Sequence, residues 1–188
     1  MKYIVAIIGK AGAGKDTIQD MLCQQHKEYH KIVSCTTRPK RENEIEGINY
    51  YYLNNEEFAQ KVINGDMLEA TYFNGWHYGT SKDSLVDGIN IGVFNPGGYD
   101  CLIQMPEDEV KLIGFYIIAS DKTRMLRQLN REQFPDVHEI IRRFQADEED
   151  FEDLETAPAI NVIINDNQNI QDVVDEINTI IQDLVHFD

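Results

Sequence analysis

The sequence lacks a long hydrophobic run. Its apolar runs, such as residues 3–8 and 162–164, fall far short of the roughly 20 residues that a bilayer-spanning helix needs. Its mean hydropathy, -0.43, is too polar for a membrane protein. Gly9 ends the first run before it is long enough for the apolar segment of a signal peptide. We therefore expect a cytoplasmic protein with no membrane partner.

Cysteine is scarce, and the three cysteines, Cys23, Cys35 and Cys101, form no C-x-x-C pair. An odd number of widely spaced cysteines argues against a disulfide framework and favours a reducing cytoplasm. His26 and His30 are four residues apart, a spacing that one helix face can share. Because no cysteine lies at ligand spacing from them, we expect a solvated face there rather than a zinc site.

Basic residues are outnumbered, since 17 Lys and Arg stand against 33 Asp and Glu, a formal net charge of -16. This balance argues against broad binding to nucleic-acid polymers or anionic lipid, because acidic side chains repel phosphate. The deficit is uneven: residues 1–131 carry a net charge of -2, and residues 132–188 carry -14. The nearly neutral part of the chain can therefore still hold a local phosphate site.

What the sequence does contain is an alternation of apolar runs and helical periods. Its 188 residues, 42% of them hydrophobic, suffice for one domain with a buried core. We predict strands over 2–8, 30–35, 49–53, 67–73, 89–94, 110–119 and 159–164, and helices over 15–26, 55–63, 121–131, 137–154 and 170–184. This alternation is typical of an α/β fold, with a parallel sheet covered by helices on both faces. Segment 36–88 is richer in tyrosine and turns and looks inserted between core strands.

A phosphate-binding loop follows the first predicted strand. Gly9, Gly14 and Lys15 complete the pattern G-x-x-x-x-G-K between that strand and the next helix. The glycines let backbone N–H groups point at one phosphate, and Lys15 reaches the outer phosphates of a nucleotide. We expect this loop to bind ATP through Gly9, Ala11, Gly12, Ala13, Gly14, Lys15, Asp16 and Thr17.

The loop departs from the full motif directly after Lys15. That position is ordinarily Ser or Thr, whose hydroxyl binds Mg²⁺, and here it is Asp16, followed by Thr17. Either Asp16 binds the metal, directly or through water, or Thr17 takes the hydroxyl role. The residues alone leave both alternatives open.

A basic cluster follows the second predicted strand. Arg38, Lys40 and Arg41 place three cations within four residues, next to the hydroxyls of residues 34–37. Arginine grips phosphate oxygens with a planar fork, so the cluster favours an anionic ligand. The alternative is a solvated basic turn.

Here the sequence resembles the guanylate kinase family. The family pattern Ser-x-Thr-Thr-Arg-x-x-Arg-x-x-Glu-x-x-Gly-x-Asp-Tyr is matched from Ser34 to Tyr50, except that Asn49 replaces the aspartate. Glu69 and the Tyr-Gly-Thr run at 78–80 follow in the family's order. With the phosphate loop, the resemblance covers most of the chain.

The resemblance implies which residues bind the acceptor nucleotide. Its phosphate would be held by Arg38, Arg41, Tyr50 and Tyr78, and its guanine would be read by Ser34, Glu69 and Thr80. The chemistry suits Glu69, because guanine presents two adjacent donors that an ionised carboxylate accepts together. Adenine lacks the N1 proton and would leave that carboxylate unpaired.

The resemblance also implies lid arginines that close over the transferring phosphoryl group. Arg131 and Arg143 match them, and Arg142 matches less well. As an alternative, these arginines pair with carboxylates at helical spacing, namely Glu139, Asp147 or Glu148. The implied catalytic residues are Lys15, Arg38, Arg131 and Arg143.

Asn165 and Asp166 follow the last predicted strand and resemble the family's loop beside the donor adenine. We assign Asn165 to the ATP site on this resemblance. Both residue types are also ordinary caps, so the alternative is that they cap the final helix.

One family feature is missing. Most members carry Asp-x-Asp-x-x-Gly at the end of the third core strand, and residues 93–98 have Val93 and Asn95 in place of both acids. We infer that Asp16 supplies the metal-side charge that is lost there. The departure leaves room for a deoxynucleotide or a modified guanine as acceptor, as in a divergent, phage-type member.

The implied fold is a P-loop NTPase-type parallel sheet flanked by helices, with an inserted small mixed α/β region for the nucleoside monophosphate and a helical lid. We expect one domain over 1–188, with the core at 1–35, 89–130 and 155–188, the acceptor-binding region at 36–88 and the lid at 131–154. The implied activity transfers the γ-phosphoryl group of ATP to GMP or dGMP with Mg²⁺.

Two alternatives remain. One is a catalytically inactive guanylate-kinase-like binding module, and the other is a kinase for another nucleoside monophosphate. Such modules typically lose the phosphate-loop glycines or lysine, whereas this chain retains Gly9, Gly14 and Lys15. In either case we expect small-molecule nucleotides as partners and a monomer or homodimer.

Overall fold

The core of the structure is a five-stranded parallel sheet. The computed structural model describes residues 1–131, 133–152, 154, 157–158, 160–166 and 169–186. Its strands lie in the order β2 (Tyr29–Lys31), β7 (Gly88–Val93), β1 (Lys2–Ile8), β8 (Val110–Ile118) and β9 (Ile160–Ile164). The central strand β1 is fully buried from Ile4 to Ile8, as its uninterrupted apolar run predicts.

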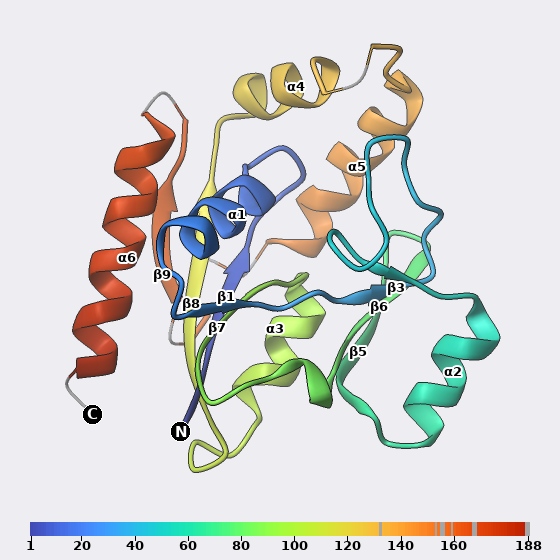
Figure 1. Cartoon of the computed structure of the whole chain (residues 1–188). Coiled ribbons are helices and arrows are strands. Elements are labelled where there is room, and N and C mark those ends of the chain that lie inside the picture. Colours follow the sequence, from blue (N-terminus) through green and yellow to red (C-terminus); the bar gives the residue numbers. More distant parts are fainter. Residues whose placement is uncertain (132, 153, 155–156, 159, 167–168, 187–188) are drawn as a thin grey trace.

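Helices cover both faces of this sheet (Figure 1). On one face, α1 (Lys15–Gln25) and α6 (Ile170–His186) contribute Ile18, Leu22, Val174 and Ile177 to the core. On the other, α3 (Pro96–Ile103) contributes Tyr99 and Leu102, and Phe151 follows α5 (Val137–Asp150). The predicted arrangement of a parallel sheet between helical layers is therefore confirmed.

A second, mixed sheet lies beside the first. Its strands are β4 (Tyr51–Tyr52), β3 (Cys35–Thr36), β6 (Trp76–Ser81) and β5 (Met67–Phe73), in that order, and α2 (Asn55–Ile63) packs Phe58 against it. A short 3₁₀ turn, η1 (Lys82–Ser84), leads back to the core sheet. Figure 1 shows this sheet and α2 to the right of the core. The whole sheet comes from residues between 35 and 81, and all of it except Cys35 lies in segment 36–88, which looked inserted.

The predicted strand over 30–35 is wrong, because the chain changes sheets there. Tyr29–Lys31 pairs with β7 of the core sheet, whereas Cys35–Thr36 pairs with β6 and β4 of the second sheet. The predicted helix over 137–154 ends earlier, at Asp150. His26 ends α1 and stacks on Tyr29, so His26 and His30 do not share a helix face.

Strand β6 and helix α3 were not predicted from the sequence. Strand β6 forms a hairpin with β5 through Asn74 and Gly75, which both have positive φ, 51° and 86°. An Asn-Gly pair is the strongest short sequence signal of such a turn, so this strand could have been found. Helix α3 begins after Asn95, whose side chain accepts a hydrogen bond from the Gly98 N–H.

The remaining helix, α4 (Asp121–Leu129), is capped by Ser120, whose side chain accepts a hydrogen bond from the Thr123 N–H. No helix in the described part of the chain combines the length and apolar character that crossing a bilayer requires. Crossovers run to both sides of β1, so the loop after β1 lies at the switch point of the sheet. In open parallel sheets this is where ligands bind.

Candidate functional site

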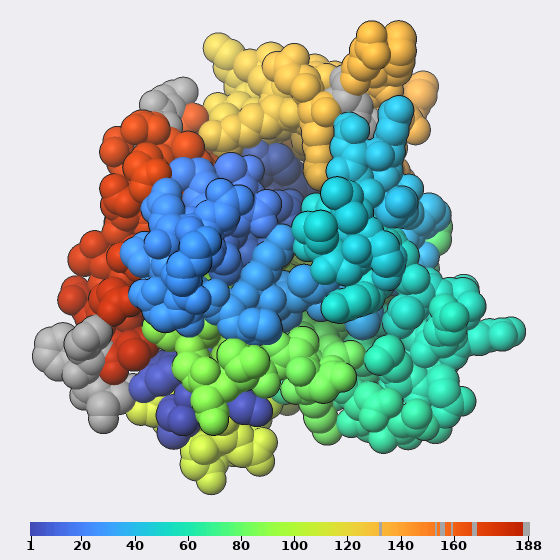
Figure 2. All heavy atoms as spheres, viewed as in Figure 1, coloured from blue at the N-terminus to red at the C-terminus, as the bar shows by residue number. Residues whose placement is uncertain are grey.

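Two adjoining cavities open at the carboxyl edge of the core sheet. The first lies between the phosphate loop, the second sheet, the end of β7 and α5. The second lies between the phosphate loop, the segment around residues 38–50, the end of α4 and Asn165. Figure 2 shows a recess bordered by α4 (yellow), α1 (blue) and the cyan segment. The residues that line both cavities are Ala11, Lys15, Arg38, Arg41, Tyr50, Tyr78, Val93 and Arg143.

The structure brings the predicted site residues together. Of the residues named from the sequence for ATP, for the acceptor and for catalysis, all but Ala13 and Thr80 line one of these cavities. Ala13 and Thr80 are fully buried. Residues that are more than 100 positions apart in the sequence, such as Lys15 and Arg143, thus belong to one cleft.

The phosphate loop has the backbone that its glycines predict. Gly12 and Gly14 have φ of 82° and 101°, a region that costs other residues strain, and α1 begins directly after Gly14. The Lys15 ammonium donates to the Lys10 carbonyl at 3.3 Å. Burial lowers the pKa of Lys15, while the charges of Asp16 and Asp147 oppose that shift.

Asp16 and Thr17 are both exposed and both line the second cavity, next to Lys15. Burial lowers the pKa of Lys15 and raises that of Tyr50, and the nearby Asp16 charge opposes the first shift and adds to the second. Its carboxylate therefore lies on the side of the loop that faces the cleft.

Arg38 is held by Glu44 rather than being free. Its Nη2 donates to both Glu44 carboxylate oxygens, at 2.8 and 2.9 Å, and both side chains are almost fully buried. The guanidinium also lies 5.5 Å from the Tyr50 ring centre. These hydrogen bonds hold the pKa of Glu44 at about 2 against the opposing effect of burial. Sequence reasoning missed this role of Glu44, although its position three residues after Arg41 is part of the family pattern.

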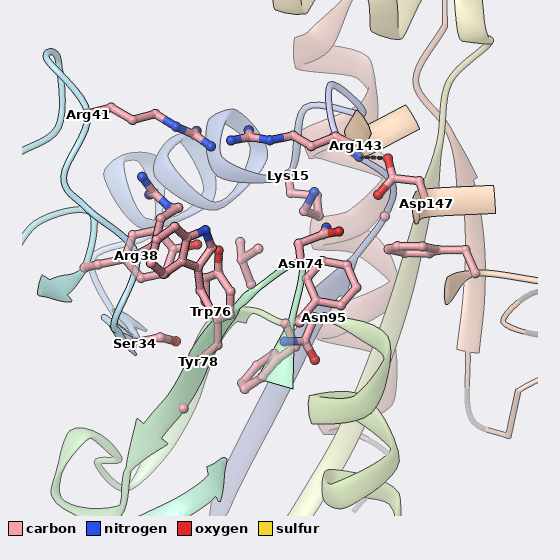
Figure 3. Close-up of a pocket in the computed structure, with 18 of the residues that line it drawn as sticks. Lys15, Ser34, Arg38, Arg41, Asn74, Trp76, Tyr78, Asn95, Arg143 and Asp147 are labelled. Carbon is pink, nitrogen blue, oxygen red and sulfur yellow. Dashed lines mark hydrogen bonds between the residues drawn. The ribbon is translucent and has the colours of Figure 1, made fainter. Parts of the chain in front are cut away.

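Arg41 belongs to a cluster of cations at the junction of the two cavities. Burial and the nearby charges of Arg143, Arg38 and Arg131 lower the pKa of Arg41 to about 10. Figure 3 shows Arg41 and Arg143 pointing toward one another above Lys15. Charges of one sign held this close are stabilised by an anion between them.

Glu69 and Ser34 line the first cavity away from this cation cluster. A β-bulge between Met67 and Glu69 shifts the strand register, and Glu69 is 7% exposed. Burial raises the pKa of Glu69 to about 7, and hydrogen bonds with Thr80 limit the rise. Thr80 also lies 3.2 Å from the Ser34 hydroxyl, so it supports these two side chains from behind.

Helix α3 leaves room for this carboxylate. A Cβ atom placed on Gly98 would lie 3.2 Å from Glu69 Oε2, so glycine in the first turn permits the close approach. Where the family has acids, Val93 lines both cavities, and Asn95 caps α3 and donates to the Thr71 hydroxyl at 2.8 Å. The stretch that lost its carboxylates therefore positions the helix beside Glu69.

The arginines of α5 both contact Glu139. Arg143 Nε donates to it at 2.8 Å and Arg142 Nε at 2.7 Å, the helical pairing considered as the alternative. Arg143 nevertheless lines both cavities. Arg142 reaches the hairpin tip, 3.4 Å from Asn74 Oδ1. Arg131 is exposed and lines the second cavity.

Asn165 supports the phosphate loop. Its amide donates to the Ala13 carbonyl at 2.8 Å, and it is 1% exposed. Asn169, rather than Asn165, accepts the N–H of Gln171 in the first turn of α6. Arg127, which sequence reasoning missed, donates to the Ala13 carbonyl at 3.2 Å and to the Asn165 carbonyl at 3.0 Å. Its position on α4, three residues after Arg124, carried no motif.

Comparisons with known proteins agree with this geometry. A curated guanylate kinase of Thermosynechococcus vestitus is 40% identical over 89 residues, covering 47% of each chain. One of Frankia casuarinae is 34% identical over 111 residues, covering 59% of this chain and 54% of that protein. In these alignments the chain spans about half the length of its curated relatives.

The solved structures support the fold. The crystal structure of a guanylate kinase from Anaplasma phagocytophilum matches with a TM-score of 0.69 at 22% identity, over 96% of this chain and 85% of that one. An uncharacterised protein from Eubacterium ventriosum matches with a TM-score of 0.56 at 13% identity, over 96% and 99%. The sequence model of the family described as "Guanylate kinase" matches residues 1–184. The chain therefore belongs to the guanylate kinase family.

Proposed function

We propose that this protein transfers the γ-phosphoryl group of ATP to GMP or dGMP, giving the diphosphate. The observation that carries the proposal is one cleft with a buried carboxylate, Glu69, at one end and the phosphate loop with Lys15 at the other. The cation cluster of Arg41 and Arg143 lies between them. The net charge of -16 favours free nucleotides over nucleic-acid polymers as ligands.

Each end of the cleft has its own task in this reaction. Glu69 accepts the N1–H and the exocyclic amine of guanine, and Ser34 donates to O6. Arg38 and Arg41 hold the acceptor's phosphate, with Tyr50 and Tyr78 lining its place. Binding of both the base and the phosphate therefore sets the distance between the attacking oxygen of the acceptor and the γ-phosphoryl group of ATP.

The chemical step needs positioning and charge neutralisation, without a covalent intermediate. Lys15 binds the transferring phosphoryl from the side of the loop, and Arg131 and Arg143 from the side of the lid. Because all these cations are already clustered, the developing negative charge meets preorganised partners. Helix α5, which lines the cleft, excludes water from it and so disfavours hydrolysis.

Magnesium fits the site through Asp16, with Thr17 as the second candidate. Both side chains carry oxygen donors, which Mg²⁺ prefers, and both line the cavity beside Lys15. When bound there, the ion would neutralise charge on the phosphate oxygens of ATP. Asp16 is favoured, because its carboxylate carries a negative charge whereas the Thr17 hydroxyl is neutral.

Asp16→Ala tests this assignment. We expect the Mg²⁺ concentration for half-maximal activity to rise about tenfold, since a metal ligand is removed and no oxygen donor replaces it. Thr17→Val is the matched control and should leave that concentration nearly unchanged. Calorimetric titration of ATP at several Mg²⁺ concentrations checks the same shift without turnover. Full activity of Asp16→Ala with unchanged Mg²⁺ dependence would refute the role of Asp16.

The proposed function itself is tested by coupled ADP release with a panel of ribo- and deoxynucleoside monophosphates. We expect turnover with GMP or dGMP, and kcat/KM for each at least about 100-fold above that for the adenine and pyrimidine acceptors. Comparing GMP with dGMP decides the sugar. Guanine-nucleotide binding without turnover of any acceptor would instead show a binding module.

A further inference from the structure

A buried ion pair lies under the phosphate loop. Arg124 of α4 is 1% exposed and Asp147 of α5 is 2% exposed, and Nη2 of the first lies 2.6 Å from Oδ2 of the second. Arg124 is the one buried residue of its helix. A pair this deep loses the hydration of two charges, so hydrogen bonds must offset that loss.

Two of these hydrogen bonds are made by one residue of the phosphate loop, Ala11. Its N–H donates to Asp147 Oδ2 at 2.8 Å, and its carbonyl accepts from Arg124 Nε at 3.0 Å. Figure 3 shows the Asp147 carboxylate at the loop beside Lys15, with its hydrogen bond dashed. Both polar groups of one peptide residue are thus held by opposite charges from two helices.

The arginine is fixed on its remaining sides as well. Its Nη1 donates to Asp121 at 2.8 Å, and its guanidinium lies 4.2 Å from the Phe144 ring centre. Next along the loop, a Cβ on Gly12 would lie 2.6 Å from the Arg124 carbonyl oxygen, so loop and helix α4 are in direct backbone contact. The guanidinium therefore joins α4, α5 and the phosphate loop in one arrangement.

The same helix face carries the arginine of the cleft. Asp147 follows Arg143 by four residues, which places both on one face of α5 about one turn apart. Lys15 ends the phosphate loop that contains Ala11. The hydrogen bond between Asp147 and Ala11 therefore sets the distance between Arg143 and Lys15. A displacement of about 1 Å at this point is enough to cost roughly 100-fold in rate.

We propose that Arg124 and Asp147 are positioning residues, which clamp Ala11 and thereby hold the lid arginine Arg143 and the phosphate-loop Lys15 at one distance. Through this clamp, the conformation of the phosphate loop and the position of α5 depend on each other. The expected effect of the clamp on the reaction rate rests on the proposed function. Its expected effect on the conformation of the phosphate loop rests on the structure alone.

The test replaces both charges by apolar groups of similar size, Arg124→Met with Asp147→Leu. Removing a whole buried pair in this way is often neutral for stability, whereas removing one partner is strongly destabilising. We expect an unchanged melting temperature, a kcat lower by about 100-fold and a KM for GMP within about twofold of the original. Asp147→Asn keeps the side-chain volume and an acceptor oxygen. We expect its kcat to lie between those of the original protein and the double variant.

Glu148→Gln is the matched control. Glu148 is the next residue of α5 and also bonds the phosphate loop, through Lys10 at 2.7 Å, but its side chain is 62% exposed. We expect its kcat to stay within about twofold, because exposed pairs contribute little. A stably folded double variant with the original kcat would overturn the proposal, since the pair would then serve stability alone.

Hydrogen exchange supplies a readout that needs neither turnover nor a variant. We expect the Ala11 amide of the unaltered protein to exchange at least about 100-fold more slowly than an unstructured amide, because Asp147 holds its hydrogen. Fast exchange of that amide would overturn the clamp. If instead the unaltered protein turned over no acceptor, the proposed function would fail while slow exchange still supported the clamp.

Discussion

Replacing Lys15 by alanine is expected to abolish phosphoryl transfer, with kcat lower by at least about 1,000-fold. Lys15 supplies the loop's mobile charge, and it stands where the two cavities meet. The arginines across the cleft cannot replace it, because they approach the phosphoryl group from the opposite side. The fold should persist, since the Lys15 ammonium contacts only the Lys10 carbonyl at 3.3 Å among the hydrogen bonds of the described residues.

The measurement is coupled ADP release, with acceptor binding followed separately. Trp76 is the one tryptophan of the chain, lines the first cavity and is 37% exposed, so its fluorescence reports acceptor binding there. Lys15→Ala should retain GMP binding within about threefold, since it removes no contact to the base. Lys10→Ala changes the same residue type in the same loop and should keep most of its activity. A Lys15→Ala protein with a kcat within tenfold of the original would contradict the assigned role.

Replacing Glu69 by glutamine is expected to lower kcat/KM for GMP by about 100- to 1,000-fold. The amide offers one acceptor oxygen without charge, so it cannot take both guanine donors, and its NH₂ group opposes the exocyclic amine. Acceptors that lack the two donors should lose much less. The panel assay measures both ratios, and equal losses for all bases would refute base reading by Glu69.

The same residue sets a pH dependence. Burial raises the pKa of Glu69 from 4.5 to about 7, yet guanine needs the ionised carboxylate. Acceptor affinity should therefore rise about tenfold per pH unit up to pH 7 and then level off. The sign is opposite for folding, since a raised carboxyl pKa makes the free protein lose stability as pH rises from 4.5 to about 7. GMP titrations followed by Trp76 fluorescence check the first effect, which Glu69→Gln should remove.

Much of the site could be predicted because its chemistry is local in the sequence. The phosphate loop needs a buried strand, glycines at fixed offsets and a helix start, and all three lie within residues 2–15. The segment from Ser34 to Tyr50 likewise carries two arginines of the cleft, their partner Glu44 and Tyr50 in one run. These features depend on backbone conformations and side chains of residues that are close together in the sequence.

The sequence by itself determined the parallel α/β fold, the phosphate loop and most of the residues that line the cleft. Only the tertiary structure decided which charges meet. No sequence motif marks three charged residues of the helices, Arg124, Arg127 and Asp147. They differ from solvated charges only through the residues that bury them and bond to them. The electrostatic energy of a charge depends on the burial and partners that distant segments supply, and helical spacing alone does not encode either.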